Sequence, residues 1–391
     1  MINKINQLFD RVFFTPKPLP PGKCSSTMEI EGVPYRMHLR LGNDGAGILI
    51  LNASTVLHLN QTAAEIAYYV INKHQTEEIA SFLVKRYQVN RETALQDIED
   101  FKTRIETLVQ SPDLDPETFL DMERVARHGE DNEIPLRLDC ALTYQIPSGQ
   151  SNLYTPVDRV VRNLHTEEWK QILNQSWEWG IPHVVFTGGE PTLRPDLPEL
   201  VRYAEGLGQV TGLITDGDRL ADKEYFQALL NSGLDHLMIL LNDKEESSWE
   251  AIRDAVNEDI HLTVHITVTE ELFGEVVPLM DKLGGMGVQN ISVSTPSQML
   301  KARLSEVSQL AVEKGFALIY DLPVPYGELN PINAELEEDQ TAVKGAARSW
   351  LYVEPDGDVL PEQGYPARLG NLLTDGWMNV SVNRKMYLSN S

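Results

Sequence analysis

The chain has 391 residues, with 33 Lys and Arg against 58 Asp and Glu, which gives a formal charge of −25. This length is sufficient for two or three domains, and the composition, 42% hydrophobic and 23% charged, is that of a globular protein. The negative charge argues against nucleic acid as a partner, because phosphate backbones are bound by clustered Lys and Arg. The two cysteines, Cys24 and Cys140, are too few for a disulfide framework or for the thiolates of a metal cluster.

Residues 1–26 are expected to form an N-terminal extension. They contain no long apolar run followed by a cleavage site for secretion, and no later segment approaches the roughly 18 apolar residues of a membrane span. The sequence therefore predicts a cytoplasmic protein without a membrane partner.

Residues 27–110 are predicted to form a small α+β domain. Apolar and polar side chains alternate in short runs from residue 27 to 60, which predicts three strands. Three helical segments follow up to residue 110. The N-caps expected for these helices are Thr62, in a capping-box pattern with Glu65, then Thr76 and Asn90.

Residues 111–135 contain eight acidic residues, two basic residues and three prolines. This composition is typical of an acidic linker.

Residues 136–325 alternate short β-branched runs with helical segments, a pattern that predicts parallel strands joined by right-handed crossovers. The fold class is therefore α/β, with a barrel or partial barrel whose ligands lie at the carboxyl ends of the strands. The runs expected as strands include HVVFTG, VTGLIT, HLMILL, LTVHITV, NISVST and FALIYDL. Residues 326–391, with a hairpin signal at Asp356–Gly357, are expected to form a small appended module.

The sharpest local motif is Gly188-Gly189-Glu190-Pro191, between a β-branched strand and a helix. Glycines at a strand end let the backbone approach a ligand, and the carboxylate offers an acceptor for an ammonium group. A tight turn between strand and helix is the equally weighted alternative.

With its flanks, FTGGEPTLRPDLPELV resembles the S-adenosylmethionine (SAM) contact segment of radical SAM enzymes, where it follows the second barrel strand and holds the amino acid end of SAM. LITDGDRL resembles the sequence of the third barrel strand in the same family, with Asp216 in place of the usual Asn. VEPDGDVLPEQGY and LGNLLTDGW resemble the SPASM extension of peptide-modifying members, and residues 30–110, with LNQTAAEI, resemble the PqqD-like peptide-recognition domain, which is similar to a winged helix. The resemblance implies a partial (β/α)6 barrel and a SAM contact formed by Thr187, Gly188, Gly189, Glu190 and Pro191.

The sequence departs from this family at its metal ligands. The family holds a 4Fe–4S cluster with a CxxxCxxC loop, and an ungapped alignment of LTYQIPSGQSNLY places Ile146, Gln150 and Leu153 at the three cysteine positions. None of these side chains supplies a thiolate. In the C-terminal module, Glu362 stands at one cysteine position, and Ala346 or Ala347 lies where another is expected. No 4Fe–4S cluster is therefore expected, and SAM stays an open possibility because the cluster anchors it in the family.

Other candidate sites are weaker. His261 and His265 are spaced like a metal pair, but on a strand they lie roughly 13 Å apart. Tyr144, Asp139 and Glu190 are candidate acids or bases at one cavity mouth. A winged helix for DNA is disfavoured, because residues 61–110 hold six basic and eight acidic residues.

The PqqD-like resemblance implies that a leader peptide adds as a strand to a sheet edge, with side chains against the last helix. The candidate contacts are Ile48–Leu51 and the helical Ile98, Phe101 and Ile105, although a core role is the simpler interpretation of each.

The leading hypothesis is a catalytically inactive radical SAM homologue, a pseudoenzyme that binds a precursor peptide and assists an active radical SAM partner. The alternative is an enzyme that binds SAM or a nucleotide and runs non-radical chemistry in the barrel. A third hypothesis is that a partner chain supplies the missing cluster ligands.

Overall fold

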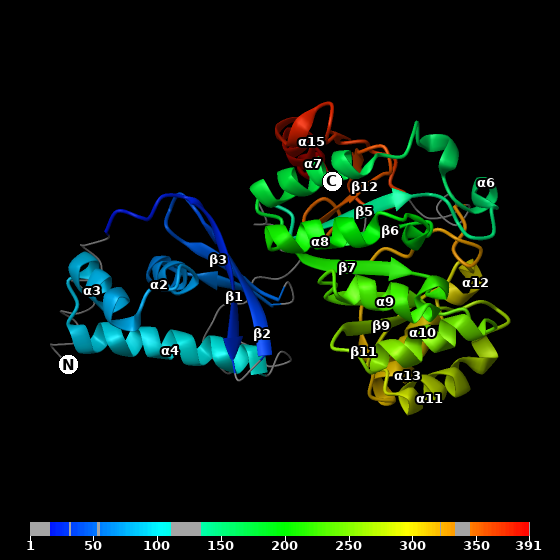
Figure 1. The fold of residues 1–391 in the computed structure, drawn as a ribbon, viewed down its shortest axis with the longest axis horizontal. Coiled ribbons are helices and arrows are strands. Elements are labelled where there is room, and N and C mark those ends of the chain that lie inside the picture. Colours follow the sequence, from blue (N-terminus) through cyan, green and yellow to red (C-terminus); the bar gives the residue numbers. More distant parts are fainter. Residues whose placement is uncertain are drawn as a thin grey trace. The chain divides into compact units, whose positions relative to one another are not determined.

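The computed structural model describes residues 16–30, 33–52, 55–110, 134–320, 322–332 and 345–390. Most of the expected extension and linker lies outside these residues. The chain forms two compact units, Met1–Arg127 and His128–Ser391 (Figure 1). Among the described residues, no helix combines the length and the apolar character that crossing a bilayer requires.

The first unit is a four-stranded antiparallel sheet with three helices. Its strands lie in chain order: β1 (Gly22–Ile30), β2 (Val33–Leu41), β3 (Gly47–Leu51) and β4 (Thr55–Leu59). The helices are α2 (Gln61–Ile71), α3 (Thr76–Tyr87) and α4 (Arg91–Gln110). The prediction of three strands from residue 27 was wrong, because β1 begins at Gly22 and its half-exposed, largely polar sequence hides the alternation.

Two of the three expected N-caps differ by one or two residues. The side chain of Asn60, not Thr62, caps α2 by accepting from the backbone N–H of Ala63, which leaves Glu65 free to enter the core. Gln75, not Thr76, precedes α3. Asn90 does cap α4, since its Oδ1 accepts from the N–H of Thr93 at 2.7 Å.

The second unit is built on a ten-stranded sheet whose central part is parallel, as expected for a partial (β/α)6 barrel. Its six main strands are β5 (Arg137–Thr143), β6 (His183–Gly188), β7 (Val210–Thr215), β8 (His236–Leu240), β9 (His261–Thr267) and β10 (Asn290–Ser294). FALIYDL supplies only the two-residue edge strand β11 (Ala317–Leu318), which is shorter than predicted.

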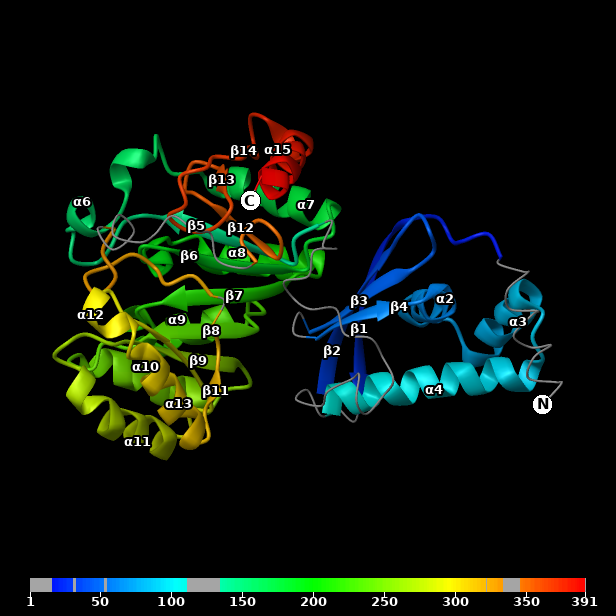
Figure 2. The same ribbon diagram turned by 180° about the vertical axis from the view of Figure 1, so that it is seen from behind.

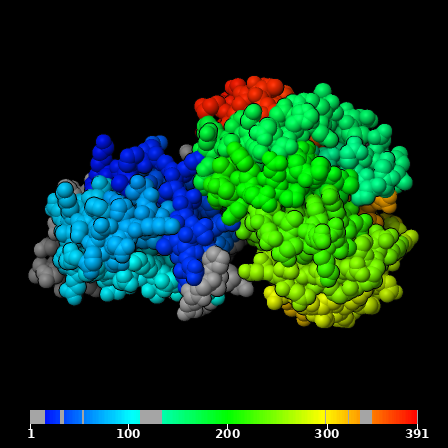
Figure 3. All heavy atoms as spheres, viewed as in Figure 1, coloured from blue at the N-terminus to red at the C-terminus, as the bar shows by residue number. Residues whose placement is uncertain are grey.

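Helices follow the strands and cover one face of the sheet (Figure 1), and residues coloured green to yellow form most of the surface of the second unit on that side (Figure 3). They are α7 (Thr166–Glu178), α8 (Leu197–Leu207), α9 (Lys223–Leu230), α10 (Glu246–Val256), α11 (Val276–Met286) and α13 (Leu304–Glu313). Shorter helices are α6 (Ser151–Tyr154) and α12 (Gln298–Lys301), with 3-10 turns η1 (Val157–Arg159), η2 (Pro191–Leu193), η3 (Asp218–Ala221) and η4 (Phe273–Glu275).

The C-terminal residues continue this sheet beyond β5. β12 (Trp350–Val353) pairs in parallel with β5, and β13 (Asp358–Leu360) and β14 (Gly370–Asn371) follow it antiparallel. The predicted hairpin is present, with Gly357 at φ +89°. The closing helix α15 (Gly376–Asn390) was not predicted. The segment is thus part of the barrel sheet, where the sequence suggested an appended module.

Candidate functional site

The loop after β5 carries the three positions aligned with cluster cysteines. Ile146 is buried, and its N–H donates to Ser151 Oγ at 3.1 Å, whereas Gln150 is exposed and Leu153 is 62% exposed. In the described part of the chain, no group of three His, Cys, Asp or Glu side chains is placed to hold a metal ion. An aliphatic side chain, an amide and an exposed leucine do not fit an iron–sulfur cluster, which needs anionic thiolates.

The two glycines of the GGEP motif are required by contact with β5. Gly188 has φ +141°, and a Cβ there would lie 2.1 Å from the carbonyl oxygen of Thr143. A Cβ at Gly189 would lie 2.4 Å from the carbonyl oxygen of Gln145. The N–H groups of Gly189 and Glu190 donate to these same two carbonyls at 2.8 Å. This geometry is the tight turn that the sequence left as an alternative to close approach of a ligand.

The carboxylate of Glu190 is buried and already holds four hydrogen bonds from its own chain. Oε1 accepts from the N–H and hydroxyl of Thr192 at 2.8 and 2.5 Å and from the hydroxyl of Thr215 at 2.8 Å. Oε2 accepts from the N–H of Asp216 at 2.8 Å. Glu190 therefore ties the ends of β6 and β7 together. Of the five predicted contact residues, Thr187 has a buried hydroxyl with no hydrogen-bond partner in the structure.

Asp216 forms a carboxyl pair with Glu190. Burial and the Glu190 carboxylate raise the pKa of Asp216 from 3.8 to about 8, and burial raises the pKa of Glu190. The folded state therefore keeps a proton on Asp216 at pH 7, which makes it resemble the neutral Asn usual in the family.

A pH-dependent stability follows from this pair. An acid whose pKa is raised by folding stabilises the fold below its unfolded pKa, and the contribution is lost as the pH rises from about 4 to about 8. We expect Asp216→Asn to remove this loss and to raise the free energy of unfolding by roughly 2 kcal/mol at pH 8.5, with little change at pH 4. Urea unfolding at both pH values measures the difference. An equal effect of Asp216→Asn at pH 4 and pH 8.5 would contradict the raised pKa of Asp216.

Tyr144 and Asp139 each have a separate partner, so these two residues and Glu190 do not share one cavity mouth. The Tyr144 hydroxyl donates to Glu354 Oε1 at 2.9 Å, and Arg159 donates to the same oxygen at 2.6 Å. Burial raises the pKa of Tyr144 well above its usual value. Sequence reasoning missed Glu354, which lies 210 residues from Tyr144 in the chain.

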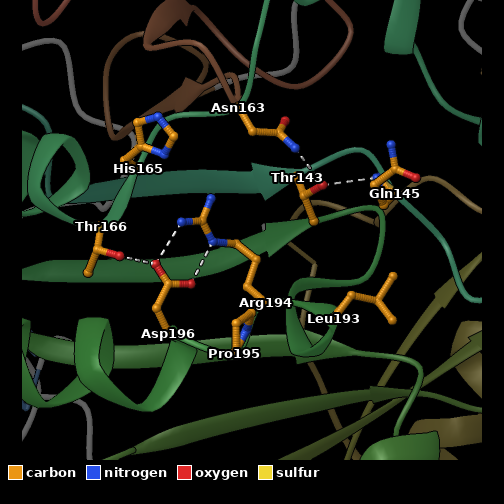
Figure 4. Close-up of a pocket in the computed structure, with 9 residues that line it drawn as sticks. All are labelled: Thr143, Gln145, Asn163, His165, Thr166, Leu193, Arg194, Pro195 and Asp196. Carbon is orange, nitrogen blue, oxygen red and sulfur yellow. Dashed lines mark hydrogen bonds and ion pairs between the residues drawn. The ribbon is translucent and has the colours of Figure 1, made fainter.

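A cavity of about 410 Å³ lies beside the motif (Figure 4). Its polar side chains bond to one another: Arg194 pairs with Asp196 at 2.7 Å, and Thr166 donates to Asp196 at 2.6 Å. Asn163 donates to Thr143 Oγ1 at 3.3 Å. The lining leaves no cluster of unsatisfied groups that would select a ligand. The lining residues are Thr143, Gln145, Asn163, His165, Thr166, Leu193, Arg194, Pro195 and Asp196.

The structure brings together the cysteine-equivalent positions of the C-terminal segment. The N–H of Ala347 donates to the carbonyl of Pro361 at 2.9 Å, next to Glu362. Arg384 of α15 is 2% exposed and donates to the carbonyls of Ala347 and Arg348. Burial and the charge of Arg348 lower the pKa of Arg384 to about 10. The Arg384 guanidinium thus binds the backbone of Ala347 and Arg348, the region where the resemblance implies a cluster ligand in related proteins.

The remaining candidates are structural. His261 and His265 lie on β9, as the strand interpretation required, and burial lowers the pKa of His265 to about 4. Ile48–Leu51 belongs to β3, which pairs on both sides, so it is not a sheet edge. Ile98, Phe101 and Ile105 are buried in the core of the first unit.

Two features define the class of this protein. One is a partial (β/α)6 barrel with a GGEP turn after its second strand, and the other is a unit of antiparallel sheet and three helices that precedes the barrel in the sequence. The radical SAM superfamily model matches residues 140–261, and the model of coenzyme PQQ synthesis protein D (PqqD) matches residues 47–107. The PqqA peptide cyclase of Bradyrhizobium diazoefficiens is 37% identical over 277 residues, 61% of this chain and 70% of that protein. The PqqA peptide cyclase of Streptomyces rochei is 29% identical over 255 residues, 56% and 67%.

Solved structures agree on the fold. Streptococcus suis SuiB bound to precursor peptide SuiA has a TM-score of 0.56 at 17% identity, covering 88% of this chain and 86% of that one. SuiB bound to S-adenosylmethionine has a TM-score of 0.53 at 16% identity with the same coverage. The chain belongs to the radical SAM superfamily, among the peptide-maturation proteins that include the PqqA peptide cyclases.

Proposed function

We propose that this protein is a radical SAM homologue without a cluster, which binds a precursor peptide and assists an active radical SAM partner. The observation that carries the proposal is the donor chemistry after β5, where Ile146, Gln150 and Leu153 stand at the ligand positions. A chain without three thiolates there has no ligand set for the cluster that starts the family's chemistry.

Peptide binding is assigned to the first unit. β4 is an outer strand of its sheet, and such an edge accepts an added strand by backbone hydrogen bonding. β1 is the other outer strand, but the PqqD model begins at residue 47 and so includes β3 and β4 and leaves β1 outside. The relatives are named for a peptide substrate, and SuiB was solved with its precursor peptide, which supports the same role here.

A partner is assigned to the second unit by charge. Met1–Arg127 has 14 Lys and Arg against 17 Asp and Glu, whereas His128–Ser391 has 19 against 41. An acidic barrel favours a partner that presents basic side chains, and such an association weakens as salt rises.

The first test is metal loading. We expect the purified chain, after anaerobic incubation with iron and sulfide, to bind less than about 0.1 iron per chain and to form no 5′-deoxyadenosine from SAM with a reductant. A PqqA peptide cyclase treated in parallel is the positive control. A reducible cluster on the isolated chain that cleaves SAM would refute the proposal, and iron only in a copurified complex would place the thiolates on a partner.

The second test is peptide binding. Titration of the full chain with short peptides encoded near it, followed by fluorescence anisotropy, should identify a leader that binds in the micromolar range. With that leader bound, amide hydrogen exchange should slow in residues 55–59, because an added strand pairs the outward N–H groups of β4. Residues 22–30 of β1 serve as the internal control and should not change. If exchange slowed only in β1, the peptide would bind at β1 and the assignment of the site to β4 would be wrong.

The unpartnered hydroxyl of Thr187 is the one observation on the GGEP strand that fits the alternative of non-radical chemistry on SAM or a nucleotide. The acceptors of the GGEP motif are engaged by the chain itself, and the cavity beside it presents groups that bond to each other.

A further inference from the structure

One segment of the chain lies against the inner face of the barrel sheet. Val185 of β6, Ile214 of β7 and Met238 of β8 form a small buried cluster, and Leu322 packs against it. These three residues face the side opposite to the helices, since their neighbours Val184, Leu213 and Leu237 belong to the main core. Figure 2, which views the sheet from behind, shows the orange part of the chain passing over that face.

Tyr326, four residues further on, is attached to the GGEP motif. Its backbone N–H donates to the carbonyl oxygen of Gly188 at 3.2 Å. Its ring is 3% exposed and meets the ring of Tyr144 edge-on, with centroids 5.5 Å apart. Arg159 donates to its hydroxyl at 3.3 Å. Tyr326 therefore contacts both the motif that holds SAM in the family and the residue that opens the loop aligned with the cluster cysteines.

The segment is also fixed along its length. The N–H of Ile332 donates to the carbonyl of Tyr154 at 2.8 Å, at the end of the cysteine-free loop. The side-chain amides of Asn330 and Gln363 both donate to the carbonyl of Val324 at 2.8 Å. The segment is thus attached to the rest of the barrel at Leu322, Val324, Tyr326 and Ile332.

Thr187 lies next to the contact between Tyr326 and Gly188. Its hydroxyl is buried and has no hydrogen-bond partner, although it lies next to Gly188 and on the same face of β6 as Val185. An unsatisfied buried hydroxyl costs about 1–3 kcal/mol, so such groups are uncommon in a well-packed interior. No side chain of residues 322–332 forms a hydrogen bond with this hydroxyl.

We propose that residues 322–332 form a built-in plug that occupies the SAM position of this barrel. The plug uses the Gly188 carbonyl and covers the inner faces of β6, β7 and β8, so the barrel is closed by its own chain and does not take up SAM. This inference goes beyond the proposed function, because it concerns the barrel alone and is tested without a peptide.

The experiment is amide hydrogen exchange of the full chain with and without 1 mM SAM, followed by mass spectrometry. In the absence of SAM we expect the amides of Tyr326 and Ile332, which donate to Gly188 and Tyr154, to exchange at least about 1000-fold more slowly than in an unstructured peptide. SAM should leave both this segment and residues 185–192 unchanged. Exchange of 322–332 at loop rates would overturn the plug. So would a SAM-dependent change, either faster exchange in the segment or slower exchange at the motif, because either shows a lid that SAM displaces.

Variants of the plug give a second readout. Leu322→Ala combined with Tyr326→Ala should speed exchange in 322–332 at least about 10-fold while leaving β9 and β10 unchanged. The matched control is Leu329→Ala, in the same segment but 41% exposed, which should change nothing. If the double variant does not fold, Tyr326→Phe is measured in its place. This variant keeps the ring and the backbone donor, so amide exchange in residues 322–332 should match that of wild type. Equal effects of Leu329→Ala and Tyr326→Ala would contradict specific anchoring.

Discussion

Gly188→Ala is expected to leave little or no soluble folded protein. The added Cβ would lie 2.1 Å from the carbonyl oxygen of Thr143, an atom of the β5 backbone that cannot move aside without breaking the β5–β6 pairing. The φ of +141° adds strain that only glycine avoids. Together these effects should cost at least about 4 kcal/mol, a large part of the stability of a typical domain. Soluble yield and urea unfolding measure the loss.

Gly206→Ala is the matched control. Gly206 lies in α8, and a Cβ there would meet no atom within 4 Å. Because alanine is the better helix former, this variant should be as stable as wild type or more stable by up to about 1 kcal/mol. A folded Gly188→Ala protein with wild-type stability would contradict the requirement for glycine that the contact with β5 imposes.

Asp139→Ala is expected to be the second most damaging change. Asp139 and Arg137 face each other from alternate positions of β5, with Nε to Oδ1 at 2.7 Å and Nη2 to Oδ2 at 3.0 Å. Their side chains are 2% and 8% exposed. Removing the Asp139 carboxylate takes two charge-assisted hydrogen bonds from the buried Arg137 guanidinium, which costs roughly 3–5 kcal/mol. Denaturant unfolding at pH 7 measures it.

The control removes both charges. Arg137→Met with Asp139→Leu removes both charges of this pair, so most of the lost stability should return. A recovery of less than about 1 kcal/mol would show that Asp139 has a further role beyond the pair. Such a result would reopen its candidacy as an acid or base.

The order of helices and strands could largely be predicted from local sequence patterns, because strand alternation and helix periodicity depend on neighbouring residues. The parallel strands β6–β10 and the helices α2–α4 were predictable for this reason. The edge of the first sheet was not, since β1 is polar and half-exposed and shows no clear alternation. Ile48–Leu51 of β3 was taken for an edge because the run GILILNASTVLHL does not reveal that it divides into β3 and β4, which pair with each other.

The site was only partly predictable. The GGEP turn is a local feature, so its position after β6 followed from the sequence. Its partners are not local: Glu190 bonds to Thr215, Tyr144 to Glu354, and Gly188 to Tyr326. These pairs lie 25 to 210 residues apart, and no sequence spacing predicts such contacts. The three-dimensional structure is therefore needed to tell whether a hydrogen-bond acceptor already has a partner within the chain.

The pairing of β12 with β5 restricts how this protein can change by deletion. β5 is buried at all seven positions, and β12 supplies hydrogen bonds along its outer side. Cutting the chain before Trp350 would turn β5, a fully buried strand, into an open edge, and such edges recruit other chains. Changes in this terminal segment must therefore keep its backbone, and side-chain replacement is the route that leaves the barrel sheet intact.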